Sequence, residues 1–576
     1  MAPPSVETAP SVETNCTVEA RTIEIIDAPR GFLGRPEFQP RVPSKDGGSV
    51  WLPEDPYFSP PIPPTSAGFD PGPRQGLSTL FRAVGERWDI PYADRARAHL
   101  EALDRAGTRL AITGQQPGFL TGPLFTVFKA VSVIAAAEFL QRKTGTAHVP
   151  VFWVAGEDHD LDEARASRFP GTVTGQLGPG RTDPGPMGTV EFAMPHAADR
   201  RPLSSYAADG PFEDVLGRAL AHLAGRRHGE LVRSMGSLYR GRGLAGGFAA
   251  ILARLFERQG LLIVEPESLR ARAAPLVRRV LEEPHRIIEL LREGIAAVEA
   301  RGLRAQVPDR FPLFLIEGGR RHHLAPAGGR GGFRLEGTGR EFATRELIDL
   351  LDRSPELFST GVALRPVVQD ALLPTAVYLG GAAEVAYFAQ LRPLFAWYGL
   401  PPPRIALRLS ATLVEGKTAR LLRRIGLSAA PERWPNARGA ADLLGAPAGS
   451  PEEPLHSLAS DARGRLAAAL ADPRIGGAAR KKLESAARKV AEDIEGIAAR
   501  AGRAVKLSRE DDFASAQRIF GSFFPDGDLQ ERRWNIFHYL AKYGSGWLGE
   551  VVEAVVRDPF RVAHRWIFFG ESGEGE

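Results

Sequence analysis

Cysteine is nearly absent from this chain of 576 residues, which contains only Cys16. A single thiol excludes an internal disulfide framework and every metal site built on several cysteines. Residues 1–20 contain a near repeat, SVETAPSVET, and are expected to form a disordered extension. Cys16 is therefore not expected to be a catalytic nucleophile, because thiolate activation requires fixed basic neighbours. The scarcity of cysteine fits a reducing, cytoplasmic compartment.

A strong net charge and long apolar runs are also missing. The formal net charge is +4, and no block of like charge occurs, so a nucleic-acid partner is not implied. The sequence shows neither a signal-peptide pattern nor an apolar run of about 18 residues, so a membrane partner is not expected. With 43% hydrophobic and 25% charged residues, the composition is that of a globular protein, and the length predicts two or three structural units.

The stretch over residues 109–162 carries the clearest structural pattern. An apolar run over 109–113 predicts a strand, a glycine-spaced turn follows, and Pro123 favours the start of a helix over 124–140. The run over 149–155 predicts a second strand that is buried on both faces. The helix is apolar almost all round, which predicts a core helix, too short and too charged to span a membrane. Together these elements predict a βαβ crossover of a parallel sheet.

Polar residues follow both strands of this crossover. Thr113-Gly114-Gln115-Gln116 follows the first strand, and Glu157-Asp158-His159-Asp160 follows the second. Ligands of open parallel sheets bind beyond the carboxyl ends of the strands, so we expect a site there, with Asp158, His159 and Asp160 as the catalytic candidates. The alternatives are a solvated loop with a capping Asp, or a metal site. A metal would need further ligands from elsewhere, and no HExxH motif exists, so none is assigned.

Two glycine-containing segments are candidates for nucleotide-binding loops. The turn after Gly114 fits neither the dinucleotide fingerprint nor the phosphate loop. Residues 411–418, ATLVEGKT, satisfy a permissive phosphate-loop template, but bulky Leu413 and Val414 and anionic Glu415 stand where phosphate would bind. An ordinary strand-to-helix connection is therefore expected at 411–418.

Further strands and helices continue the α/β pattern along the chain. The residues predict helices over 75–105, 231–258 and 271–301, a buried strand over 261–265, loops and short strands over 169–195, a small β insertion over 306–335 and a strand over 404–409. A second polar-rich region contains Arg365, Gln369 and Asp370, which fit a ligand clamp or a structural salt-bridge cluster. Gly380 and Gly381 precede a helix whose first turn holds Glu384.

The C-terminal region is expected to be mainly helical, with one strand possible at its end. Apolar residues there repeat alternately at intervals of four and three, which indicates a heptad seam: Leu483, Ala487, Val490, Ile494, Ile497, Ala501 and Ala504. Both an intermolecular coiled coil and an amphipathic helix docked on its own domain fit this seam.

Several sequence blocks together resemble one protein family. The blocks are TGQQPGFLTGPLFTVFK (113–129), PVFWVAGEDHD (150–160), LRPVVQDALLPTAVYLGGAAEVAYFAQL (364–391), RLSATLVE (408–415), and FPDGDLQER with YLAKYG (524–532 and 539–544). In this order they resemble the bacillithiol biosynthesis cysteine-adding enzyme (BshC) family.

The resemblance implies an α/β fold with a Rossmann-type parallel-sheet core, two connecting-peptide-like insertions and a C-terminal α-helical coiled coil that forms a homodimer. On this chain the core would cover 21–410, with insertions near 165–245 and 303–345. The helical region would cover 411–576, with the coiled coil near 480–507. The candidate residues for binding substrate or cofactor are Thr113, Gly114, Gln115, Gln116, Gly118, Lys129, Glu157, Arg365, Gln369, Asp370, Tyr378, Gly380, Gly381, Glu384 and Tyr387.

The resemblance also implies a reaction, the joining of the carboxyl group of cysteine to the amine of glucosaminyl malate. A carboxylate does not acylate an amine unaided, so ATP or a related nucleotide is expected to activate it. The Gly114–Gly122 turn and the following helix start are expected to receive an anionic group, Asp158 or Asp160 the cysteine ammonium, and Arg365 a carboxylate of malate. His159 is expected to deprotonate the amine. Alternatives are a nucleotidyl- or glycosyl-type transferase and a non-catalytic nucleotide- or sugar-binding scaffold.

Overall fold

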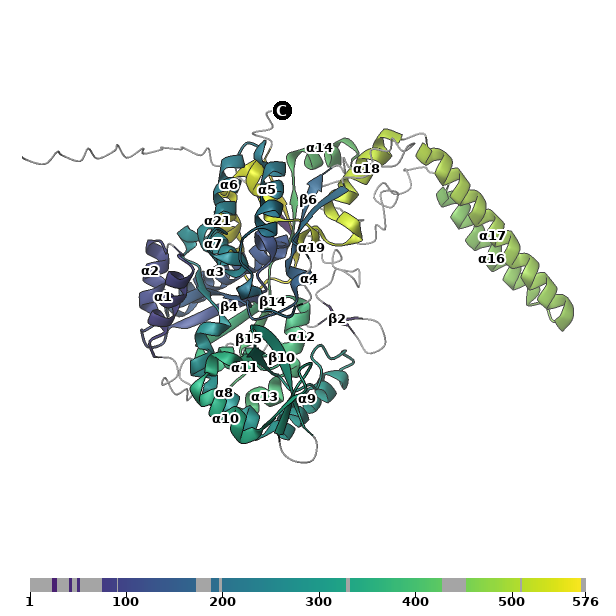
Figure 1. The fold of residues 1–576 in the computed structure, drawn as a ribbon. Helices are drawn as coiled ribbons and strands as arrows, with labels where there is room; N and C mark the ends of the chain where they lie inside the picture. The colour runs from purple at the N-terminus through teal and green to yellow at the C-terminus, as the bar shows by residue number, and fades with distance from the viewer. Residues whose placement is uncertain are drawn as a thin grey trace, which may run out of the picture.

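A parallel sheet of five strands lies at the centre of the chain (Figure 1). The chain runs outward from β4 through β5 to β8, and then returns to the other side of β4 for β14 and β15. This order is that of a Rossmann-type sheet, whose direction of winding reverses between β4 and β14. The strands are β4 (Arg109–Gln115), β5 (His148–Val154), β8 (Leu262–Val264), β14 (Thr375–Gly380) and β15 (Arg404–Leu407).

The computed structural model describes residues 23–27, 41–43, 49–51, 75–90, 92–171, 188–195, 199–327, 332–426, 452–507 and 510–570. The extension over residues 1–20, including Cys16, lies outside this part of the chain. The predicted βαβ unit is confirmed, since β4 and β5 are parallel and α3 (Leu124–Thr144) connects them.

Helices cover both faces of the sheet, and each face has its own hydrophobic core. One core contains α3, α5 (Pro211–Ala224), α6 (Gly229–Ser237), α7 (Gly243–Leu255), α20 (Ile536–Tyr543) and α21 (Trp547–Val556). The other contains α1 (Leu77–Arg87), α2 (Asp94–Ala102), α8 (Arg270–Glu282), α9 (Pro284–Glu299), α10 (Thr344–Arg353), α11 (Arg365–Leu372), α12 (Ala382–Gln390) and α13 (Arg392–Trp397). The sheet is thus buried on both sides, as its continuous apolar strands predict.

The predicted β structure between the core strands is confirmed. An antiparallel sheet has the order β12 (Arg340–Ala343), β11 (Gly332–Leu335), β10 (Arg320–Pro326), β9 (Leu313–Glu317) and β13 (Phe358–Thr360). A hairpin of β6 (Ala166–Gly171) and β7 (Gly188–Ala193) follows the short helix α4 (Leu161–Ala164). A further small hairpin pairs β2 (Arg41–Pro43) with β3 (Ser49–Trp51).

The C-terminal region contains a sheet as well as helices. In it β17 (His564–Phe568) lies between β1 (Glu24–Asp27) and β16 (Ser410–Val414). The helices are α14 (Gly416–Arg424), α16 (Glu452–Leu470), α17 (Gly477–Leu507), α18 (Glu510–Phe523) and α19 (Gln530–Arg533). The strand that the sequence leaves possible at the end of this region is present as β17.

The segment with the permissive phosphate-loop template is the expected strand-to-helix connection, because β16 leads through Glu415 into α14. Glu415 Oε1 lies 2.7 Å from His538 Nε2 and 2.8 Å from Lys542 Nζ. The Glu415 carboxylate thus places a negative charge at the start of α14.

The helix α3 is longer than expected. It has 21 residues and is the one helix in the described part of the chain that is long and apolar enough to cross a membrane by length and composition. The expectation that it is too short is therefore wrong. Its position in the core is confirmed, because 78% of its most apolar window is buried inside the protein.

The coiled-coil element is an antiparallel hairpin of α16 and α17, which projects away from the body of the protein (Figure 1). Within the hairpin, Ala491 and Ala498 of α17 are fully buried, and Ile494 is half-buried. Three residues of the predicted seam are not covered by α16: Leu483, Val490 and Ile497 are 46–47% exposed. The helix therefore packs on α16 rather than on the main body, and an apolar stripe is left uncovered.

The turn between β4 and α3 is buried and is held by the C-terminal region. Asn535 Nδ2 donates to the carbonyl oxygens of Leu120 (2.7 Å) and Gly122 (2.8 Å), and the Leu120 amide donates to Tyr239 Oη (2.8 Å). Leu120 has φ 49°, and Gly122 has φ 66°. Since left-handed residues persist only where their surroundings fix them, Asn535 is needed to hold this turn.

Substitution Asn535→Ala is expected to lower the free energy of unfolding by about 3 kcal/mol, because it leaves buried carbonyl groups without donors. Urea unfolding followed by circular dichroism measures the change. Arg532→Ala is the matched control, since Arg532 is exposed in α19, and it should change stability by less than about 0.5 kcal/mol. Equal stability of the Asn535→Ala and Arg532→Ala proteins would contradict this role.

Candidate active site

Lys129 and Glu384 form an ion pair at the point where the strand order reverses. Lys129 Nζ lies 2.7 Å from Glu384 Oε2, and it donates to Gly114 O (2.7 Å) and to Gln115 Oε1 (3.0 Å). The Lys129 side chain is 4% exposed and that of Glu384 is 19% exposed, so the lysine is buried and the glutamate is half-buried. The structure thus brings together candidates from β4, α3 and α12, which lie far apart in the sequence.

Glu384 occupies the first turn of α12, as expected. Its Oε2 accepts from the Gly381 amide (2.8 Å), and its Oε1 accepts from Tyr378 Oη (2.7 Å). Burial alone would raise the pKa of this carboxyl, but Lys129 and these hydrogen bonds hold the pKa below its ordinary value. Glu384 is therefore an anion near neutral pH.

Two features at the ends of β4 and β14 allow Glu384 to lie in this position. Thr113 Oγ1 donates to Leu379 O (2.6 Å) and joins the ends of β4 and β14. A Cβ atom at Gly380 would lie 2.8 Å from Glu384 Cβ, so only glycine permits this approach of α12.

Arg365 lies beside this pair and contacts neutral groups. Its Nη2 donates to Tyr387 Oη (2.6 Å), and its Nη1 donates to Gln369 Oε1 (3.2 Å). The guanidinium carbon is 5.7 Å from the ring centroid of Tyr378. In the described part of the chain, no ion pair joins Arg365 to a carboxylate, so the predicted salt-bridge cluster does not include it.

Asp370 is not brought to this edge of the sheet. Gln369 Nε2 donates to Asp370 Oδ1 (3.1 Å), and the electrostatic effect of Asp370 raises the pKa of Arg109, although burial lowers it overall. Arg109 is the first residue of β4 and Gln115 is the last, so the two residues lie at opposite ends of the strand. Asp370 is therefore placed nearer the amino end of the strand than the proposed pocket.

The acidic loop after β5 is fixed by partners from distant elements. Glu157 is buried, and its Oε2 lies 3.2 Å from Arg270 Nη2, while Thr360 Oγ1 donates to its Oε1 (3.2 Å). Asp158 Oδ2 accepts from Gln116 Nε2 (2.7 Å). Gln116 thereby joins the two strand ends on which the sequence places the site.

Asp160 caps a helix, as the solvated-loop alternative proposes. Its Oδ1 accepts from the Glu163 amide (3.4 Å) at the start of α4, and its side chain is exposed. Asp158 Oδ1 accepts from the amides of His159 (2.7 Å) and Asp160 (3.3 Å). Asp158 thus faces Gln116 and the loop, whereas Asp160 serves the helix.

His159 contacts an arginine that the sequence does not identify. Arg321 Nη1, from β10, lies 3.3 Å from His159 Nδ1. Burial and the charge of Arg321 lower the pKa of His159, and Asp158 opposes that shift. No sequence signal marks Arg321, because the segment RRHH gives no indication that its second arginine points toward β5.

The glycine-spaced turn is closely packed. Gly118 packs against Gly122, since a Cβ atom at Gly118 would lie 2.9 Å from Gly122 Cα. The Leu124 amide at the start of α3 donates to Trp534 O (2.8 Å). The Leu124 amide is therefore already satisfied by the protein, and the expected binding of an anion at this turn and helix start stays a prediction.

A metal centre is not found in the described ranges, where no cluster of three or more histidine, cysteine or acidic residues has suitable geometry. This observation concerns only the part of the chain that the structure describes.

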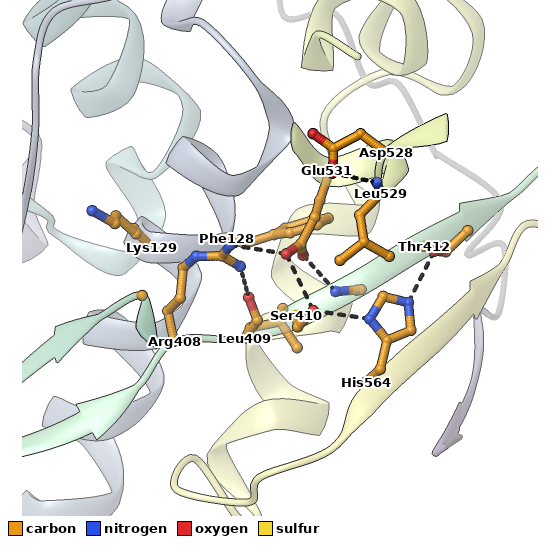
Figure 2. Close-up of polar contacts among 12 residues, drawn as sticks. Phe128, Lys129, Arg408, Leu409, Ser410, Thr412, Asp528, Leu529, Glu531 and His564 are labelled. Carbon is orange, nitrogen blue, oxygen red and sulfur yellow. Dashed lines mark hydrogen bonds and ion pairs between the residues drawn. The ribbon is translucent and has the colours of Figure 1, made fainter. Parts of the chain in front are cut away.

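A buried polar network joins the edge of the main sheet to the C-terminal sheet (Figure 2). Arg408, directly after β15, donates from Nη2 to Glu531 Oε1 (2.8 Å). Ser410 Oγ donates to the same oxygen (3.2 Å) and lies 2.8 Å from His564 Nδ1, whose ring reaches Thr412 Oγ1 through Nε2 (2.9 Å). Burial lowers the pKa of His564 to about 4, so its ring is neutral. The sequence blocks RLSATLVE and FPDGDLQER meet here.

Comparison with known proteins agrees with this architecture. Residues 65–409 match the family model for the N-terminal Rossmann-like domain of bacillithiol biosynthesis BshC, and residues 465–569 match its C-terminal coiled-coil domain. A Salinibacter ruber protein named "Putative cysteine ligase BshC" is 32% identical over 86% of this chain and 89% of its own length. A protein of the same name from Heliobacterium modesticaldum is 33% identical over 84% and 89%. The chain therefore belongs to the BshC family of bacillithiol biosynthesis.

Proposed function

We propose that this protein is a cytoplasmic ligase that joins the carboxyl group of cysteine to the amine of glucosaminyl malate, in the last step of bacillithiol biosynthesis. Membership of the BshC family and the names of its relatives support this reaction. The observation that carries the proposal for the site is the convergence of Gln116, Lys129, Asp158 and Glu384 at the carboxyl ends of β4, β5 and β14.

Amide formation from a carboxylate requires an activated acyl group. In the proposed reaction, a carboxylate oxygen of cysteine attacks a phosphoryl group of ATP, which gives an acyl-adenylate with pyrophosphate or an acyl-phosphate with ADP. The amine nitrogen then forms the C–N bond, and AMP or phosphate leaves with the electron pair of the broken C–O bond. The proton of the amine passes to water.

The side chains suggest how the substrates are oriented. We assign the ammonium group of cysteine to Asp158, because Asp158 meets Gln116 between the two strand ends, whereas Asp160 lies at the start of α4. Arg365 suits a carboxylate of malate, because its partners in the described part of the chain are the neutral groups of Tyr387 and Gln369.

A second candidate is a nucleotide-binding scaffold without catalytic activity. A cavity of about 590 Å³ beside α14 is lined by Lys417, Arg420, Arg424, Arg518 and Lys542, and also by Glu415, whose carboxylate pairs with Lys542. Positive charge in a cavity of this size suits a phosphorylated ligand. A nucleotidyl- or glycosyl-type transferase on the same sheet would differ in its products.

Purified protein mixed with glucosaminyl malate, cysteine and ATP is expected to form bacillithiol, with one nucleotide product for each amide formed. Mass spectrometry measures the thiol, and chromatography separates AMP from ADP. A scaffold would bind nucleotide without forming an amide, and a transferase would form a nucleotidyl or glycosyl product. Either of these two results would contradict the ligase proposal.

Substitution Arg365→Lys is expected to raise KM for glucosaminyl malate roughly tenfold and to change KM for cysteine little, because an ammonium group cannot bind a carboxylate through two parallel hydrogen bonds. Steady-state kinetics with each substrate varied in turn measures the effect. Arg353→Gln, an exposed position on α10, is the control. An equal rise of both KM values would remove Arg365 from malate recognition.

We also propose that a second copy of this chain covers the exposed stripe of Leu483, Val490 and Ile497. These residues are spaced by seven on α17, so they lie along one face of the helix. Exposed apolar side chains at heptad spacing suit an equivalent stripe of another hairpin, which would give a homodimer.

Replacing Leu483, Val490 and Ile497 together with lysine is expected to convert a dimer into a monomer, since charges would then face each other across the interface. Size-exclusion chromatography with light scattering measures the mass. Lysine at Ser485, Glu492 and Ala499, which are exposed with the same spacing on another face, should leave the dimer intact. A wild-type protein that is monomeric at micromolar concentration would contradict the dimer.

A further inference from the structure

Arg321 reaches from the antiparallel sheet to the acidic loop after β5, and each part of its guanidinium is fixed. Its Nε donates to Ser359 Oγ (2.9 Å), and its Nη2 donates to Thr360 O (2.7 Å). The guanidinium carbon lies 3.8 Å from the ring centroid of Phe314. With only 6% of the residue exposed, Nη1 has a fixed direction toward His159.

This contact determines which nitrogen of His159 carries the proton. A guanidinium can only donate hydrogen bonds, so Nδ1, at 3.3 Å from Arg321 Nη1, must be the acceptor. The nearest carboxylate oxygen, Asp158 Oδ1, is 3.9 Å from Nδ1, too far for a hydrogen bond, and it already accepts from backbone amides. The proton of the neutral ring is therefore on Nε2.

The charges around His159 also favour the neutral ring. Partial burial and the charge of Arg321 lower the pKa of His159, and Arg200 acts in the same direction. Asp158 and Asp160 oppose the shift without reversing it. A protonated ring would place a hydrogen on Nδ1 directly against the Arg321 guanidinium.

The Nε2 atom is available to a ligand. Within the described part of the chain, no residue forms a hydrogen bond with His159 Nε2, and 27% of the side chain is exposed. A base would need a free lone pair, but the lone pair of the neutral ring is on Nδ1 and faces Arg321.

We propose that Arg321 is a positioning residue that fixes His159 as a neutral hydrogen-bond donor, in place of the general base expected from the sequence. This role rests on the proposed ligase reaction. When the amine nitrogen bonds to the acyl carbon, the C=O electron pair moves to oxygen, which accepts a hydrogen bond from Nε2–H. The oxygen then restores the C=O bond, the activating group leaves, and the amine proton passes to water. His159 neither gains nor loses a proton.

The tautomer can be observed without substrate. In full-length protein labelled with [¹⁵N]histidine, two-bond ¹H–¹⁵N correlations distinguish the two neutral forms, and comparison with His159→Ala identifies the signal among the 12 histidines. We expect the Nε2–H form and a titration below the ordinary pKa of about 6.5. A proton on Nδ1 would overturn the proposal, whatever reaction the protein catalyses.

Substitution of Arg321 tests the cause. Arg321→Met removes the donor and keeps the length, so the pKa of His159 should rise and the Nε2–H preference should weaken. Arg321→Lys retains a charge and should give a smaller change, and it serves as the second variant if the methionine protein does not fold. Arg320→Met, an exposed position on the same strand, is the control. Identical His159 spectra in the Arg320 and Arg321 variants would overturn the positioning role.

Turnover distinguishes a donor from a base. The side-chain amide of glutamine can donate a hydrogen bond but cannot accept a proton at neutral pH, so His159→Gln should retain at least tenfold more kcat than His159→Ala. Equal loss in both variants, with the Nε2–H form still present in the wild type, would refute the donor role and leave the tautomer standing. If no amide forms even with wild-type protein, the proposed function fails, and the spectra still decide the role of Arg321.

Discussion

The ion pair of buried Lys129 and half-buried Glu384 is the interaction on which the geometry of the sheet edge depends. Taking two charges out of water is costly, and it is tolerated only when hydrogen bonds satisfy the remaining atoms. Here Gly114, Gln115, Gly381 and Tyr378 supply those bonds. These residues lie in β4, in β14 and directly before α12, so a shift of any of these segments would leave a charged group of the pair without its hydrogen-bond partners. The pair therefore holds the polar ends of β4 and β14 in one arrangement, at the position where ligands bind in Rossmann-type sheets.

Local patterns predict much of this core. The βαβ unit, the strand at β8 and Glu384 in the first turn of α12 are confirmed, because each follows from short-range periodicity and from glycine or proline at its ends. The joining of the two strand ends also follows, since parallel neighbours end at the same edge. The length of α3 is underestimated, because charged Arg142 and Lys143 look like the end of an apolar helix, although they form its last, exposed turn.

The contacts that the sequence does not predict join residues that are far apart along the chain. Asn535 lies 415 positions from Leu120, Arg321 lies 162 from His159, and Glu531 lies 123 from Arg408. Periodicity describes one element at a time, so it cannot indicate which turn or strand end a distant polar side chain will meet. Asn535, Arg321 and Glu531 are polar residues of types that usually lie at the surface, and only tertiary packing buries them. The resemblance between sequence blocks indicates that such segments belong together, but it does not identify the bonds.

The ion pairs within the protein bear on the proposed recognition of malate by Arg365. Lys129, Arg270 and Arg408 each face a carboxylate of the protein itself, namely Glu384, Glu157 and Glu531. Their charges are neutralised before any ligand arrives. Arg365 differs, since its bonds in the described part of the chain go to Tyr387 and Gln369, and no negative charge balances it at hydrogen-bond distance. Glu384 favours the charged form of Arg365 without touching it, and together with Tyr387 and Tyr378 it raises the pKa of the guanidinium although burial acts in the opposite direction. The proposed carboxylate of malate would add a direct ion pair. Arg321 also has no carboxylate at hydrogen-bond distance in the described part of the chain, but its guanidinium is held by Ser359, Thr360 and His159. Arg365 is therefore the cation of this edge to which the proposed function assigns a carboxylate of the substrate.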